Sequence, residues 1–274
     1  MVKRRTVFFL SDRTGITAET LGLSLISQFE DVHFSQVTLP FIDSIEKAAD
    51  ATNRINQCVA NQGDKPIVFS TILDPSIRKV LERSDAYYID FFKTFLPGLE
   101  TELKIPSANV TGRIHSAGDP HAYNTRIEAV NYALNYDDGA RTSGYDSADV
   151  ILVGVSRCGK TPTCLYLAMQ FGIRAANYPL TEDDLHVTTL PKMLRPHRQK
   201  LFGLTIDAKR LHAIRSSRSP NSTYATLQQC EREVKAVEDL FHHENIPFLS
   251  STNLSIEELA TKLMVISGIE RRLR

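Results

Sequence analysis

The chain has 274 residues, of which 42% are hydrophobic and 23% charged, an ordinary balance for a globular protein with a sizeable core. Lys and Arg total 32 and so do Asp and Glu, so no net charge draws the chain to nucleic acid or to an anionic membrane. No apolar run is long enough to cross a bilayer, and the apolar stretch near the N-terminus is too short for a secretion signal. The four cysteines, Cys58, Cys158, Cys164 and Cys230, include no C-x-x-C pair, which is typical of reduced thiols. We therefore expect a cytoplasmic protein.

The first half of the chain alternates between strand-like and helix-like segments. β-branched and aromatic runs predict strands at residues 6–10, 34–39 and 66–72. Helical periodicity predicts helices at residues 16–29, 44–61, 75–83, 93–103 and 122–136. This alternation is typical of an α/β layer with a parallel sheet. The sequence Asp137-Asp138-Gly139 ends the last of these helices, and the polar stretch ARTSGYDSAD follows it. We place a domain boundary there, with an N-terminal α/β domain over residues 1–145 that serves target recognition or dimerisation.

The segment SDRTGITAE, residues 11–19, follows the first strand and opens the first helix. Thr14 or Thr17 is suited to cap that helix, and Gly15 permits a close backbone approach. A second anion site at the helix N-terminus is the alternative interpretation. Elementary physical chemistry favours ordinary capping over the anion site.

A phosphate-binding loop is the most informative feature of the second half. A strand predicted at residues 148–153 is followed by Gly154-x-x-x-x-Gly159-Lys160-Thr161 and then by a helical face. The two glycines let the backbone turn so that successive N–H groups point at phosphate oxygens. Lys160 supplies a point charge for the terminal phosphates, and the Thr161 hydroxyl is placed to coordinate Mg²⁺. The alternative is an incidental glycine-rich turn, which the flanking strand and helix disfavour.

The remaining elements complete a pattern typical of a compact nucleotide kinase, which we assign to residues 146–274. Further strands are predicted at residues 174–178, 201–206 and 246–250. Further helices are predicted from residue 207 onward, at 224–244 and at 255–267. The fold class is therefore α/β: an N-terminal α/β domain and a C-terminal P-loop kinase-like domain with a parallel sheet.

Acidic residues follow the second strand of this domain, in NYPLTEDDL. Because ligands bind at the carboxyl ends of parallel strands, Asp183 or Asp184 is a candidate to hold Mg²⁺ through water or to take a proton from an attacking hydroxyl. Helix capping by Thr181 and the acidic residues explains the same sequence equally well.

Two basic clusters lie further along the chain. Basic loops over a phosphate site can neutralise charge on a migrating phosphoryl group, whereas the alternative for any single residue is a solvated basic surface. We expect at least one of the two clusters to contact phosphate. The first cluster comprises Lys192, Arg195, His197, Arg198 and Lys200, and the second comprises Arg215 and Arg218.

Several stretches together resemble the family of phosphoenolpyruvate synthase and pyruvate, phosphate dikinase regulatory proteins. They are SDRTGITAE, RIEAVNYALNYDDG, GVSRCGKTPT and IRAANYPLTEDDL, and the similarity runs along essentially the whole chain. Gly159 and the TEDDL sequence indicate the synthase branch. The resemblance implies a bifunctional enzyme that phosphorylates a threonine of phosphoenolpyruvate synthase from ADP. It also implies the reversal of this modification by inorganic phosphate, with release of pyrophosphate.

The resemblance implies a nucleotide site at Gly154, Val155, Ser156, Arg157, Cys158, Gly159, Lys160 and Thr161. A mechanism compatible with these residues uses Lys160 to grip ADP and Thr161 to bind Mg²⁺. Asp183 orients or deprotonates the nucleophile, with Asp184 or Asp12 as the next candidates, and Arg157 or a mobile arginine stabilises the migrating charge.

Other interpretations stay open from the residues alone. A small-molecule kinase of the shikimate or nucleotide type is one alternative, and a nucleotide-switch protein without transfer activity is another. Cys158 is either a redox-sensitive thiol or a plain small residue, and the second is the preferred interpretation. We also expect a homodimer.

Overall fold

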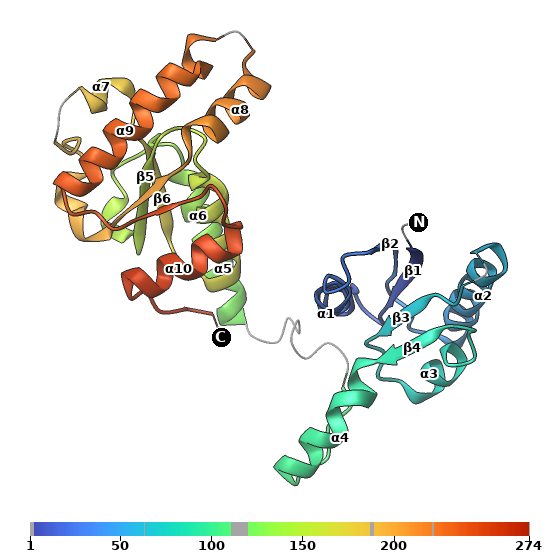
Figure 1. Cartoon of the computed structure of the whole chain (residues 1–274). Helices are drawn as coiled ribbons and strands as arrows, with labels where there is room; N and C mark the ends of the chain where they lie inside the picture. Colours follow the sequence, from blue (N-terminus) through green and yellow to red (C-terminus); the bar gives the residue numbers. More distant parts are fainter. Residues whose placement is uncertain (1–2, 63, 111–119, 187–188, 221, 274) are drawn as a thin grey trace. The chain divides into compact units, whose positions relative to one another are not determined.

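The computed structural model describes residues 3–62, 64–110, 120–186, 189–220 and 222–273. The chain divides into two compact units, residues 1–116 and 117–274 (Figure 1). The expected boundary near residue 145 therefore lies too late in the sequence. Helix α5 (Pro120–Asn135) belongs to the second unit, where it packs against α6 and β6. Ala129, Ala133 and Tyr145 are part of that unit's core. The polar stretch after α5 is a loop within the second unit.

The first unit is built on a four-stranded parallel sheet in the order β2-β1-β3-β4. Strand β1 pairs with β2 along its whole length, from Lys3 beside Val32 to Leu10 beside Leu39. Strand β4 is absent from the expected elements, because four residues with little alternation carry no strong local signal and pairing with β3 decides their conformation. The elements are β1 (Lys3–Leu10), α1 (Ile16–Ile26), β2 (Val32–Leu39), α2 (Ile45–Gln62), β3 (Ile67–Ser70), α3 (Pro75–Leu81), β4 (Tyr87–Asp90) and α4 (Phe91–Leu103).

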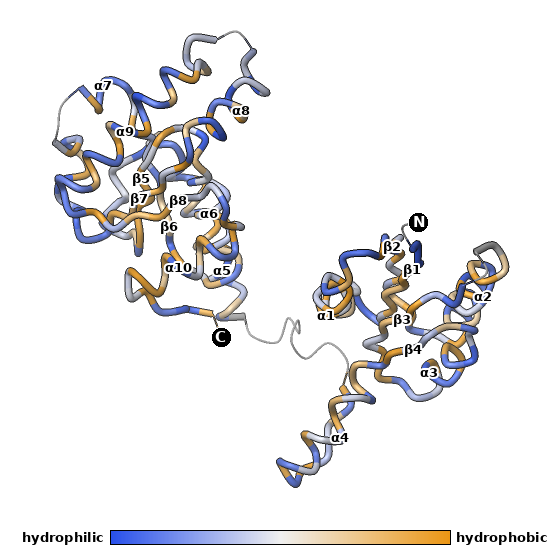
Figure 2. Tube along the Cα trace, viewed as in Figure 1, coloured by the Kyte–Doolittle hydropathy of each residue, from blue (hydrophilic) through white to orange (hydrophobic). Residues whose placement is uncertain are grey.

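Helices cover both faces of this sheet, as parallel sheets require. Phe8 and Leu10 of β1 face a core that α2 and α3 complete. Val7 and Phe9 face the opposite core, which α1 and α4 complete. Figure 2 shows the hydrophobic strands at the centre of the unit and the more hydrophilic helix surfaces around them. The alternation of side chains along β1 thus serves two cores at once.

The second unit has a four-stranded parallel sheet in the order β6-β5-β7-β8. Helices α5, α6 and α10 pack together, and α8 packs with α9 (Figure 1). All five residues of β5 are buried, which explains why this strand is a continuous apolar run. Besides α5, the elements are η2 (Tyr145–Ser147), β5 (Val150–Gly154), α6 (Lys160–Phe171), β6 (Ala175–Pro179), α7 (Glu182–Leu185), η3 (Arg195–Lys200), β7 (Leu201–Thr205), α8 (Ala208–Arg218), η4 (Thr223–Ala225), α9 (Leu227–His243), β8 (Phe248–Ser250) and α10 (Ile256–Ser267).

The two sheets share one topology, which confirms the α/β prediction. In each unit the first strand is central, the next strand lies on one side of it, and the third and fourth lie on the other. The connections from two neighbouring strands therefore run in opposite directions between β1 and β3 and between β5 and β7. In such sheets ligands bind beside this point, at the carboxyl ends of the strands.

In the part of the chain that the structure describes, no helix combines the length and the apolar character that crossing a membrane needs.

Candidate nucleotide site

The loop between β5 and α6 is shaped by two glycines. A Cβ at Gly154 would lie 2.1 Å from the backbone oxygen of Leu204 on β7, so any side chain there would push the two strands apart. Gly159 is the N-cap residue of α6 with φ of 99°, in the left-handed region that favours glycine. Arg157 also has a left-handed φ, of 76°, and its side chain is exposed. No side chain caps the N-terminus of α6, which leaves its first turn suited to an anion.

Lys160, the first residue of α6, is 4% exposed. Its Nζ donates to the backbone oxygens of Gly154, at 3.1 Å, and Val155, at 2.9 Å. Among the residues that the structure describes, no carboxylate forms an ion pair with Lys160. Because buried charges are normally paired with opposite charges, an ammonium held by carbonyls alone is suited to a phosphate oxygen.

Thr161, the second residue of α6, meets a carboxylate that the sequence did not predict to be in the site. Its hydroxyl donates to Oδ1 of Asp137 at 2.8 Å, and the side-chain amide of Asn177 donates to the same oxygen. Asn177 lies on β6, is fully buried, and accepts from the backbone N–H of Asp138 at 3.1 Å. Asn177 and the chain after α5 thus hold Asp137 at the start of α6.

The Thr161 and Asp137 oxygens fit a magnesium ion. Mg²⁺ is usually held by one or two protein oxygens together with water and substrate phosphates. The described residues contain no group of three or more His, Cys, Asp and Glu that could form a complete protein site for a metal. Both oxygens lie at the first turn of α6, beside the loop that would hold the phosphates.

Arg215 of α8 connects the loop to the helices beside it. Its guanidinium donates to the backbone oxygens of Ser156 and Tyr224, each at 3.1 Å, and pairs with Glu233 of α9 at 2.7 Å. The group lies 3.8 Å from the centre of the Tyr224 ring and is almost completely buried. Burial acts to lower the pKa of Arg215, but the hydrogen bond and charge of Glu233 outweigh it and raise the pKa. One basic cluster therefore lies at the loop, with Arg218 exposed three residues further along α8.

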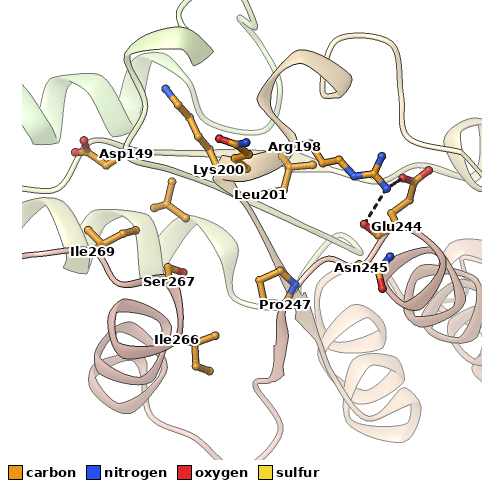
Figure 3. Close-up of a pocket in the computed structure, with 12 residues that line it drawn as sticks. Asp149, Arg198, Lys200, Leu201, Glu244, Asn245, Pro247, Ile266, Ser267 and Ile269 are labelled. Atoms are coloured by element: carbon orange, nitrogen blue, oxygen red, sulfur yellow. Dashed lines mark hydrogen bonds and ion pairs between the residues drawn. The ribbon is translucent and has the colours of Figure 1, made fainter.

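The other basic cluster lies at the opposite end of the sheet, so of the two clusters only the one with Arg215 remains a candidate to contact phosphate. Its residues occupy η3 and the segment before it, and η3 leads into the amino end of β7. Figure 3 shows the cavity of about 540 Å³ at this end, where Arg198 pairs with Glu244. Arg195 donates to the Leu190 oxygen, and Lys200 donates to the Asp146 oxygen. These cations stabilise loops around the strand starts, which the sequence order alone did not reveal.

The predicted catalytic carboxylates lie in different surroundings. Asp184 accepts from the backbone N–H and the hydroxyl of Thr181, each at 3.0 Å, which favours the capping interpretation. Burial, and then the charge of Asp184, raises the pKa of Tyr178 to about 12, and Tyr178 donates to the same carboxylate. Asp183 is exposed on α7, after the carboxyl end of β6. Asp12 belongs to the first unit, in the loop after β1.

Two further predictions concern single residues. Cys158 is buried, and burial raises the pKa of its thiol, which favours the plain small residue over a reactive thiol. Neither Thr14 nor Thr17 caps α1: its N-cap residue is Gly15, with φ of 85° and no side-chain hydrogen bond. The prediction of ordinary capping at residues 11–19 is therefore wrong.

Comparisons with known proteins identify the family of this chain. A family model described as "Kinase/pyrophosphorylase" matches residues 7–264. A relative from Legionella pneumophila (strain Corby), with the name "Putative phosphoenolpyruvate synthase regulatory protein", is 54% identical over 270 residues, 98% of this chain and 100% of the relative. A relative of the same name from Pseudomonas fluorescens (strain Pf0-1) is 57% identical over 271 residues, 99% of this chain and 100% of its own. The resemblance inferred from the motifs is thus confirmed, and the chain belongs to the kinase/pyrophosphorylase family.

Proposed function

We propose that this enzyme inactivates phosphoenolpyruvate synthase by transferring a phosphoryl group from ADP to a threonine, and reactivates it with inorganic phosphate. The family description and the names of the relatives support a phosphotransferase that regulates this synthase. The observation that carries the chemical part is Lys160: a buried ammonium that only backbone carbonyls hold among the described residues, at a helix N-terminus without a side-chain cap.

The residues of the loop and two nearby carboxylates have separate roles in this proposal. Lys160 and the amides of the loop from Gly154 to Thr161 hold the diphosphate of ADP. Thr161 and Asp137 hold Mg²⁺, which neutralises phosphate charge when it is bound. Arg157, exposed at the turn of the loop, stabilises the charge that spreads over the migrating group. Asp183 remains the proposed base, because the Asp184 carboxylate already accepts two hydrogen bonds from Thr181, the N-cap residue of α7.

The two directions are balanced in-line transfers. In the forward direction the threonine hydroxyl oxygen attacks the β-phosphorus of ADP, the bond to the bridging oxygen breaks, and AMP leaves. The hydroxyl proton goes to the carboxylate base. In the reverse direction an oxygen of inorganic phosphate attacks the phosphorus of phosphothreonine, the threonine oxygen leaves and takes up a proton, and pyrophosphate forms.

The test uses ADP labelled in its β-phosphate, with purified phosphoenolpyruvate synthase as acceptor. We expect label on a threonine of the synthase, and release of that label as pyrophosphate when phosphate is added. Lys160→Ala is expected to abolish both directions if one site serves both. Transfer of label to a small metabolite instead would support the alternative of a small-molecule kinase, and label that stays on free nucleotide would contradict both proposals.

A further inference from the structure

A cavity of about 410 Å³ adjoins the phosphate-binding loop in the second unit. Three segments form its walls: the loop, the chain that follows β6, and the region where η4 leads into α9. Ser156 comes from the loop, and the other lining residues are Pro179, Leu180, Thr181, Glu182, Thr223, Tyr224, Gln229 and Glu233.

The cavity lies on one particular side of the loop. Leu180 donates its backbone N–H to the Gly154 oxygen at 3.0 Å, so the chain after β6 runs directly beside the start of the loop. Strand β6 pairs with β5 on the side opposite to β7 and β8. The chain after β6 therefore forms one wall of the cavity, and the wall from η4 and α9 is joined to the loop through Arg215, which donates to the Tyr224 and Ser156 oxygens. An in-line transfer needs the acceptor next to the terminal phosphate, and Ser156 of the loop lines this cavity directly.

The lining chemistry indicates what the cavity binds. Ser156, Thr181 and Thr223 contribute hydroxyls, and Gln229 contributes an amide that also donates to Glu233 at 3.1 Å. Among the described lining residues there is no Lys, Arg or His, and the charge of the Arg215 guanidinium behind the wall is paired with Glu233. Such a lining disfavours phosphate and acidic side chains, which need cationic partners. It suits an uncharged, hydrogen-bonding polypeptide segment.

We propose that this cavity binds the hydroxyl-bearing segment of the protein substrate and presents its threonine to the loop. Gln229 and Thr223 then bind the substrate backbone, and Glu182 at the exposed side disfavours an acidic residue next to the acceptor. This inference rests on the proposed function and adds to it the place where the acceptor is recognised.

The test fills the cavity without touching the loop. Gln229→Trp places a large ring in the cavity, and Gln228→Trp places the same ring on the exposed neighbouring position of α9 as a matched control. We expect Gln229→Trp to bind ADP within twofold of wild type and to lower kcat/KM for phosphoenolpyruvate synthase at least tenfold, mostly through KM. Gln228→Trp is expected to match wild type. Thr223→Tyr, at the exposed start of η4 on the same wall, serves as a second filling variant if Gln229→Trp does not fold.

The outcomes separate this inference from the proposed function. If the wild-type enzyme labels the synthase and both filled variants do so equally well, the acceptor assignment is overturned and the proposed function stands. If the filled variants lose ADP binding, the cavity belongs to the nucleotide, and the acceptor assignment is again overturned. If the wild-type enzyme itself transfers no label to the synthase, both fail together.

Discussion

Removing the buried ion pair of Arg215 and Glu233 beside the loop is expected to lower the stability of the second unit. Replacing Glu233 by Gln keeps the size of the side chain and removes its charge. The Arg215 side chain is fully buried and that of Glu233 is 11% exposed, with 2.7 Å between Nη2 and Oε2. The variant therefore leaves the guanidinium inside the protein without a charged partner, beside two backbone oxygens, the Tyr224 ring, the Cys230 sulfur and the new side-chain amide.

Breaking a buried ion pair on one side typically costs about 3–5 kcal/mol. Arg215 keeps its two carbonyl acceptors and gains the amide oxygen of the substituted side chain. We therefore expect a loss at the lower end of this range, about 3 kcal/mol of unfolding free energy. For a unit of this size each kcal/mol lowers Tm by roughly 2–4 °C, which gives a fall of about 6–12 °C. ADP affinity is expected to fall as well, because Arg215 also holds the Ser156 oxygen of the loop.

Thermal and denaturant unfolding of the purified protein measure this change. Glu231→Gln, on the exposed face of the same helix, is the matched control and is expected to stay within about 0.5 kcal/mol of wild type. The double variant Arg215→Met with Glu233→Leu removes both charges and is expected to recover most of the lost stability. The reasoning is refuted if Glu233→Gln unfolds with the same free energy as Glu231→Gln.

Three further predictions address other parts of the chain. Gly154→Ala places a Cβ 2.1 Å from the Leu204 oxygen, so we expect the free energy of unfolding, measured with denaturant, to fall by about 1–3 kcal/mol. The control is Gly98→Ala, at a helical position with open space around it. We expect this control to raise the free energy of unfolding by about 0.5–1 kcal/mol. Equal effects of the two substitutions would contradict the clash. Asp137→Asn removes the negative charge of the oxygen that we propose to hold Mg²⁺. We expect the Mg²⁺ concentration for half-maximal transfer to rise about tenfold, measured by titration, and an unchanged midpoint excludes this role. Burial raises the pKa of Asp90, so the folded first unit holds this proton more tightly than the unfolded chain. The contribution of Asp90 to stability is then complete below its ordinary pKa and is lost as pH rises through the raised value, and the difference in unfolding free energy between wild type and Asp90→Asn should fall over that range.

The strand, glycine-rich loop and helix at residues 150–171 could be predicted because all their determinants are contiguous in sequence. A buried apolar strand, two glycines and an amphipathic helix each leave a local pattern that one short window contains. The same holds for the cap of α3, where Asp74 precedes Pro75 and accepts from the next two backbone N–H groups. Four-residue strand β4 has no such pattern and formed only by pairing with β3.

The contacts that complete the site depend on the tertiary structure. Thr161 and Asp137 are 24 residues apart, and Asp137 reaches the loop because Asn177 of β6 holds it there. Two basic clusters similar in composition lie at opposite ends of one sheet, since one follows β7 and the other precedes it. Composition, periodicity and spacing thus predicted the α/β class and the glycine-rich loop between a strand and a helix, and the resemblance of several motifs identified the family. Packing alone decided which distant side chains meet that loop, because chain reversals between strands bring together residues whose separation in sequence carries no local signal.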